Sequence, residues 1–234
     1  IGEKISDSLE ELGDLPLLLQ SLDNDSTRLE NLEKSRDGLW GEVKSIEAGV
    51  DAIVAEGFEA GGHNGVDETT TMCLIPKIAN GVNIPVIAAG GIGSGKAMLA
   101  SFALGAEGVQ VGSKFAVCKE SSAHQHFKQF VFDAGDGATK LTLKEITPVR
   151  MLKNDFYNKI KQAYINCASK EDLTVLLGKG RAKKGIFEGN IIDGELEIGQ
   201  IASMIDKMQT ADEIIEELIV EFNTKKANLL KINF

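Results

Sequence analysis

Apolar and polar positions divide the chain into stretches of different texture. Residues 1–42 contain no valine, their only isoleucines are Ile1 and Ile5, and Leu, Glu, Asp, Ser and Lys dominate. This composition favours helices and loops, because strands prefer β-branched and aromatic side chains. We therefore expect residues 1–45 to form a helical or irregular N-terminal segment.

From Val50 onward, nearly continuous apolar runs alternate with glycine-rich loops and helical patterns. The runs are VDAIVAEG (50–57), NIPVIAAGG (83–91) and EGVQVGS (107–113). Parallel strands that are covered on both faces have this texture, and strands that alternate with helices indicate βαβ units. Residues 46–120 are therefore predicted to form three βα units of an α/β fold.

The segments between these runs carry helix signals. TTTMCLIPKIAN (69–80) predicts a helix in which Pro76 lies near the start or introduces a kink. For the next helix, Ser94 is the predicted N-cap and Gly105 the residue at C′.

Residues 121–234 have a mainly helical pattern. Ser169 and Gly178 are expected to bound one helix, and TADE (210–213) has the capping-box pattern that starts the last one. That last helix carries an apolar face, which we expect to pack on its own domain; the alternative is a docking surface for a partner. The face consists of Ile214, Ile215, Leu218, Ile219 and Phe222.

Composition narrows the classes of partner. The net charge of −10 disfavours nucleic acid and anionic membrane surfaces, which leaves a small molecule as the expected partner. The longest apolar stretch, IPVIAAGGIG, is far shorter than the ~20 residues of a membrane span. The cysteines Cys73, Cys118 and Cys167 are isolated, so neither a disulfide framework nor a metal site is indicated, and a cytoplasmic location is expected.

Glycine-rich loops follow all three predicted strands, and loops at the carboxyl ends of parallel strands converge on one face. Gly90 and Gly91, together with Gly112 and Ser113, offer backbone N–H groups and a hydroxyl that suit a phosphate. The alternative is that these glycines only make tight turns. Two such ends in succession match the phosphate site after strands seven and eight of a (β/α)₈ barrel.

The first loop, EAGGHNG (59–65), surrounds a histidine with glycines. His63 is a candidate general acid or base, because an imidazole titrates near neutral pH; the alternative is a structural role. His124 and His126 lie in a polar helical stretch and are expected to be solvated. Glu56 is expected to contact a ligand and Glu59 to orient the loop, although the two carboxylates are an alternative acid/base pair.

Several motifs in series resemble the nitronate monooxygenase family. They are EGFEAGGHNG, TTTMCLIPKI, IPVIAAGGI and GAEGVQVGSKF, and the likeness continues to about Phe222 through RMLKNDF, RAKKGIFEGN and DGELEIGQIASMI. The resemblance implies an FMN-dependent (β/α)₈ barrel that is related to the flavin-dependent enoyl-acyl-carrier-protein reductase II. The predicted fold is thus the last three βα units of the barrel, followed by a helical region.

The resemblance also implies site residues. His63 matches the family's histidine, which contacts the nitro group or acts as a base near the flavin. Glu56 stands where the family often has a flavin-contacting Gln, and Gly62 is among the glycines expected to let FMN lie close. The residues expected to bind the FMN phosphate are Gly61, Gly90, Gly91, Gln110, Val111, Gly112 and Ser113.

The implied reaction is the oxidation of an alkyl nitronate with O₂ to a carbonyl compound and nitrite. The alternative enzyme is an NAD(P)H-dependent enoyl reductase. About 45 residues precede the match, whereas five further βα units need roughly 150. We therefore expect the N-terminal part of the barrel to be missing, which leaves three hypotheses: an incomplete flavoenzyme, a core completed by N-terminal helices or by a second copy in a homo-oligomer, or a non-enzymatic anion-binding or interaction module.

Overall fold

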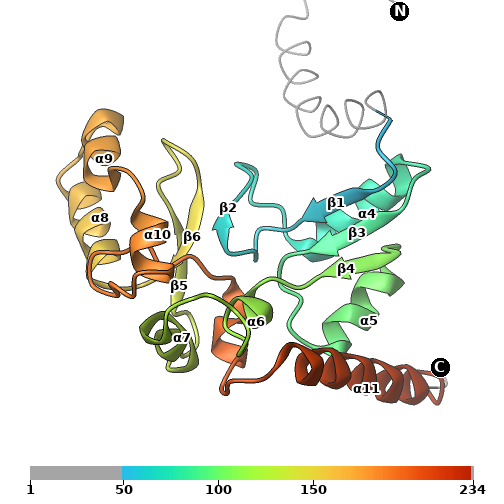
Figure 1. Ribbon diagram of the computed structural model, residues 1–234. Helices are drawn as coiled ribbons and strands as arrows, with labels where there is room; N and C mark the ends of the chain where they lie inside the picture. The colour runs from blue at the N-terminus through green and yellow to red at the C-terminus, as the bar shows by residue number, and fades with distance from the viewer. Residues whose placement is uncertain (1–48, 233–234) are drawn as a thin grey trace, which may run out of the picture. The chain divides into compact units, whose positions relative to one another are not determined.

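The computed structural model describes residues 49–232, and the residues from Asp51 on belong to one compact unit. Figure 1 shows the order of the helices and strands along this part of the chain. The predicted helical segment 1–45 lies outside the described residues. Among residues 49–232, no helix is both long enough and apolar enough to cross a membrane.

Three parallel strands form the first sheet, as the apolar runs predicted. They are β1 (Ile53–Glu56), β3 (Val86–Ala89) and β4 (Gly108–Gln110), in the spatial order β1-β3-β4. Ile53 lies opposite Val86, and Ile87 opposite Gly108. This register brings the carboxyl ends of the three strands to one edge, where the glycine-rich loops begin.

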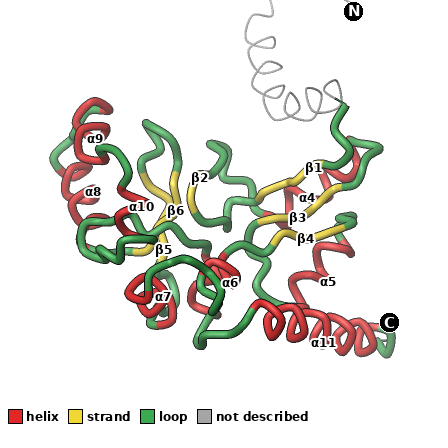
Figure 2. Tube along the Cα trace, in the orientation of Figure 1, coloured by secondary structure: helices red, strands yellow, loops and turns green. Residues whose placement is uncertain are grey.

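Helices follow these strands (Figure 2). The two predicted ones are α4 (Thr71–Gly81) and α5 (Gly95–Ala103). The short α6 (Ser113–Ala116), after β4, had not been predicted as a helix. Pro76 lies inside α4 rather than near its start. Both predicted ends of α5 are confirmed: Ser94 Oγ accepts a hydrogen bond from Ala97 N at 3.2 Å, and Gly105 follows the C-cap with φ +101°.

Residues 121–234 contain the predicted helices and also two strands that the sequence pattern did not indicate. Ser169 and Asp172 form a capping box, and Gly178 ends the same helix with φ +64°. The elements are α7 (Gln125–Phe132), β5 (Thr139–Thr142), β6 (Val149–Leu152), α8 (Asp155–Ile165), α9 (Lys170–Leu177), α10 (Arg181–Ile186), the 3₁₀ helix η1 (Gln200–Met204) and α11 (Ala211–Leu229).

A second, antiparallel sheet has the order β2-β6-β5. Its first strand, β2 (Gly62–His63), comes from the EAGGHNG loop, with Gly62 opposite Arg150 and His63 opposite Val149. All four residues of β6 are buried, between the helices on either side. The loop that carries His63 is therefore held by strand pairing as well as by its own turns.

The last helix, α11, packs mainly on α5, in agreement with the sequence interpretation. Its capping box joins Thr210 and Glu213. Ile214 and Leu218 are buried, and the Phe222 ring lies edge-on to Phe102 at 5.7 Å between centroids. The other two residues of the predicted apolar face, Ile215 and Ile219, remain 46% and 48% exposed.

Candidate functional site

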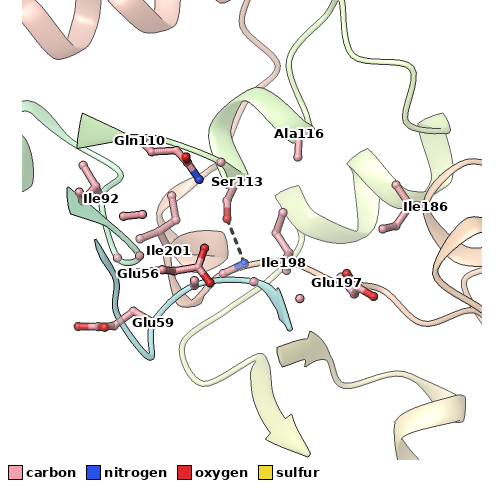
Figure 3. Close-up of a pocket in the computed structure, with 18 residues that line it drawn as sticks. Glu56, Glu59, Ile92, Gln110, Ser113, Ala116, Ile186, Glu197, Ile198 and Ile201 are labelled. Carbon is pink, nitrogen blue, oxygen red and sulfur yellow. Dashed lines mark hydrogen bonds between the residues drawn. The ribbon is translucent and has the colours of Figure 1, made fainter. Parts of the chain in front are cut away.

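A pocket of about 290 Å³ lies at the carboxyl ends of β1, β3 and β4 (Figure 3). Its wall combines the three strand-end loops with the segment that precedes η1. The lining residues are Glu56, Glu59, Ala60, Gly61, Gly62, Ala89, Gly90, Gly91, Ile92, Gln110, Gly112, Ser113, Ala116, Ile186, Glu197, Ile198, Gly199 and Ile201.

Eight of the ten residues singled out from the sequence line this pocket: Glu56, Gly61, Gly62, Gly90, Gly91, Gln110, Gly112 and Ser113. Val111 is not in the lining and packs against the apolar core beneath β4. His63 is also not in the lining; it is exposed and directly follows the lining residue Gly62 on β2. The structure thus gathers the predicted cofactor residues and places the histidine beside them.

Some of these glycines are required by the packing of the chain itself. A Cβ on Gly61 would lie 2.4 Å from Gly199 N, and a Cβ on Gly90, whose φ is +87°, would lie 2.5 Å from Gly57 O. Gly112 differs, because no atom of the described chain lies within 4 Å of its Cβ position and its φ is −95°. The fold itself therefore does not require a glycine at residue 112.

Backbone N–H groups without partners surround the pocket. Within residues 49–232, the N–H groups of Gly90, Gly91, Gly112 and Ser113 donate to no protein acceptor. Consecutive N–H groups at a turn form a concave anion site, particularly where glycines take left-handed conformations, as Gly90 and Gly91 do. These four groups are suited to binding a phosphate.

Glu59 is held by the start of α4. Its carboxylate accepts hydrogen bonds from Thr71 N at 3.0 and 3.2 Å and from Thr71 Oγ1 at 2.9 Å. Its backbone oxygen accepts from Gln200 N at 2.9 Å. These contacts agree with the interpretation that Glu59 orients the loop, and they occupy the oxygens that acid/base chemistry would need.

Three polar side chains remain available to a ligand on this side of the pocket. Burial raises the pKa of Glu56, which stands at the end of β1. Gln110 ends β4 and has an exposed amide. Ser113 Oγ accepts a hydrogen bond from Gly199 N at 3.0 Å, which leaves the hydroxyl proton free to be donated (Figure 3).

Arg150 of β6 fixes the loop after β1 from the second sheet. Its side chain is 2% exposed and donates from Nε and Nη2 to Phe58 O, at 3.2 and 2.8 Å. The guanidinium also lies 4.5 Å from the centroid of the Phe58 ring. A planar, two-donor group suits this double contact, so Arg150 holds the backbone just before the lining residues Glu59 and Ala60.

The pocket residues between 197 and 201 were not predicted from the sequence. Burial raises the pKa of Glu197, and the nearby His63 opposes that rise. Burial, with a contribution from Glu197, raises the pKa of Glu195 to about 7. The alternation of Glu195 and Glu197 with Leu196 and Ile198 is a strand-like signal that would have indicated an extended segment rather than a helix.

The pocket residues fit a phosphate-bearing flavin. Unpaired N–H groups and the Ser113 hydroxyl are donors for an anion, and the open space at Gly112 leaves room for it. Glu56 and Gln110 supply an acceptor and an amide for a polar ring edge. The described part of the lining contains carboxylates but no Lys or Arg. An anion would therefore be held by the backbone N–H groups.

Fold and site together define an α/β protein of the barrel class, with a ligand pocket at the carboxyl ends of its parallel strands. Residues 42–221 match the family model described as nitronate monooxygenase. The chain belongs to the nitronate monooxygenase family, and its parallel sheet is part of a (β/α)₈ barrel.

Individual relatives agree with this assignment. The chain is 34% identical over 217 residues to a probable nitronate monooxygenase of Staphylococcus saprophyticus subsp. saprophyticus. The aligned region covers 85% of this chain and 60% of that protein. The structure is similar to FabK from Thermotoga maritima, with a TM-score of 0.71 and 38% identity over 80% of this chain and 58% of FabK.

The structure is also similar to nitroalkane oxidase from Streptomyces ansochromogenes, with a TM-score of 0.63 and 31% identity. The similarity covers 81% of this chain and 56% of the nitroalkane oxidase chain. The chain thus spans somewhat more than half the length of these relatives.

Proposed function

We propose that the protein is an FMN-dependent oxidoreductase that oxidises alkyl nitronates with O₂ to a carbonyl compound and nitrite, in the cytoplasm. The observation that supports this most is the pocket: eight residues that the family resemblance assigned to flavin binding line it, with four N–H groups that have no protein acceptor among residues 49–232. Family membership and the similarity to nitroalkane oxidase support the choice of substrate class.

In this proposal, the N–H groups of Gly90, Gly91, Gly112 and Ser113 bind the FMN phosphate, helped by the Ser113 hydroxyl. Glu56 and Gln110 contact the flavin ring. Bound FMN would supply the electron transfer between the nitronate and O₂. The protein's own part is to bind and orient the two molecules and to exclude water around them.

His63 is the proposed proton-transfer group. It directly follows Gly62, which lines the pocket and begins β2. An imidazole in this place would donate a hydrogen bond to an oxygen of the nitronate or act as a base near the flavin ring. Glu59 takes no part in this step, since Thr71 holds its carboxylate.

A second candidate is reduction of an enoyl thioester with NAD(P)H. The similarity to FabK, an enoyl-acyl-carrier-protein reductase II, favours it, because FabK has the higher TM-score and identity of the two solved relatives described above. Both candidates use the same flavin pocket. The electron donor distinguishes them: a nitronate in one case and a nicotinamide nucleotide in the other.

The test is nitrite release from an alkyl nitronate by the FMN-loaded chain under air. We expect release in the wild type, loss of roughly a hundredfold or more in His63→Ala, and no change in His126→Ala, a histidine exposed on α7. Oxidation of NAD(P)H that requires an enoyl thioester, without nitrite release, would support the second candidate. A flavin-loaded chain with neither activity would favour a binding or interaction module.

A further inference from the structure

Between Glu59 and His63, the EAGGHNG loop presents mainly backbone to the pocket. Gly61 and Gly62 line the pocket without side chains, and Ala60 adds only a methyl group. Glycine has no side chain that packs and has more backbone freedom than any other residue, so groups outside the loop must set where its backbone lies. The shape of this part of the pocket therefore depends on the contacts between the loop and the rest of the chain.

Arg150 of β6 holds both ends of this part of the loop. At the first end, its guanidinium donates from Nε and Nη2 to Phe58 O, at 3.2 and 2.8 Å, and lies 4.5 Å from the centroid of the Phe58 ring. At the other end, Arg150 is the residue opposite Gly62 in the pairing of β6 with β2 (Figure 1). The lining residues between the two attachment points are Glu59, Ala60 and Gly61.

The guanidinium is directed at the loop and at little else. Within residues 49–232, Phe58 O accepts a hydrogen bond from no other donor, and no carboxylate forms an ion pair with Arg150. The side chain is 2% exposed, and its one further contact is with Thr139 Oγ1 at 3.4 Å. Burying a guanidinium without an ionised partner is costly. Here the buried group holds one backbone oxygen of the pocket loop.

We propose that Arg150 is a positioning residue for the cofactor pocket: it fixes the backbone from Phe58 to Gly62 in the arrangement that receives FMN. The inference rests on the proposed function, in which this pocket binds the flavin. Lysine cannot make the same contact, because an ammonium group lacks the planar fork that gives two N–H groups to one oxygen and stacks on a ring. The loop should therefore loosen in Arg150→Lys although the charge is kept.

The first test is hydrogen–deuterium exchange of the backbone amides in the chain without added flavin, measured by mass spectrometry. In Arg150→Lys, exchange over residues 58–64 should accelerate roughly tenfold, because the loop opens locally when its first end is released. Exchange in α5, which has no contact with Arg150, should keep the wild-type rate. Wild-type exchange over residues 58–64 in this variant would overturn the proposal.

The matched control is Arg181→Lys. Arg181 stands at the start of α10, where its guanidinium donates to Leu176 O and Asp193 O and lies 4.2 Å from the centroid of the Phe156 ring. These contacts have the same chemistry as those of Arg150, but none of the contacted residues lines the pocket. Exchange over residues 58–64 should stay unchanged. Equal acceleration in the two variants would overturn the proposal, because it would indicate a general loosening of the fold.

The second readout is FMN affinity, measured by flavin fluorescence titration under conditions in which each variant is folded. The Kd for FMN should rise roughly tenfold or more in Arg150→Lys and stay unchanged in Arg181→Lys. If the wild type binds no FMN while loop exchange still accelerates only in Arg150→Lys, the proposed function fails and the hold of Arg150 on the loop stands. If FMN binds equally to the wild type and to Arg150→Lys, the positioning role fails and the proposed function stands.

Phe58→Leu decides the question if Arg150→Lys does not fold. This substitution removes the ring beside the guanidinium and leaves both the Phe58 backbone oxygen and the buried charge in place. We expect a smaller effect in the same direction, with faster exchange over residues 58–64 and weaker FMN binding. Wild-type exchange and wild-type affinity in Phe58→Leu would then overturn the proposal.

Discussion

Individual glycines in the pocket have different physical reasons to be glycine. Gly61 and Gly90 lie so close to other backbone atoms that a methyl group has no space, which is a requirement of folding. Gly112 has open space and an ordinary φ, so only a ligand would require the missing side chain. The sequence alone could not separate these cases, because the same letter satisfies both.

This difference predicts the behaviour of Gly112→Ala. The substitution should leave the urea unfolding midpoint unchanged and weaken FMN binding about tenfold or more, since the methyl group enters the space proposed for the phosphate and a factor of ten corresponds to about 1.4 kcal/mol. Flavin fluorescence titration measures the affinity.

Two other glycines are the controls. Gly65→Ala, at an open position outside the pocket lining, should change neither quantity. Gly61→Ala should destabilise the fold by about 3 kcal/mol, because the added carbon meets backbone atoms. Full flavin affinity in Gly112→Ala would place the phosphate elsewhere.

Because the Glu195 carboxyl group is buried, we expect the stability of the fold to depend on pH. Its side chain is 7% exposed, and burial raises its pKa from 4.5 to about 7. Between these two values the folded chain holds the proton and the unfolded chain does not, so stability falls as the pH rises from 4.5 to 7. The full effect is on the order of 3 kcal/mol.

Glu195→Gln should therefore equal the wild type near pH 4.5 and exceed it in unfolding free energy at pH 8. Urea unfolding at both pH values measures the difference. Glu216→Gln, on an exposed position of α11, is the charge-matched control and should show no such dependence. A Glu195→Gln chain that is not stabilised at pH 8 would show that the carboxyl group is solvated in the folded state.

At the scale of helices and strands, capping residues in the sequence correctly predicted where several helices begin and end. Ser94 and Gly105 bound α5 because a side-chain hydroxyl and a residue with positive φ satisfy helix ends within a few residues. The capping boxes of α9 and α11 follow the same rule. The three parallel strands were predictable because each belongs to a nearly continuous apolar run, although among the described residues only β3 is buried along most of its length.

The second sheet was not predictable in this way. β5 and β6 have four residues each, TKLT and VRML, and β2 has two, so neither alternation nor length distinguishes them from helix or loop. Their stability comes from partners far along the chain, such as the contact of Arg150 with Phe58. For the same reason, the approach of Glu197 to the EAGGHNG loop could not be predicted from the sequence.

At the scale of the molecule, the pocket draws its wall from both halves of the described chain. The strand-end loops supply glycines and Ser113, and the segment before η1 closes the other side through the contact of Ser113 with Gly199. The patterns of the individual segments did not indicate that these parts meet. The chain spans somewhat more than half the length of its relatives, so flavin binding by this chain is the central claim to test.

The most direct measurement is the visible absorption spectrum of the chain after it has been mixed with FMN and separated from the excess by gel filtration, with the mass of the peak recorded alongside. We expect a flavin spectrum at about one FMN per chain, and the mass shows whether a homo-oligomer forms. A folded, colourless peak would rule out the proposed function, because the pocket would then not hold the cofactor that the reaction needs.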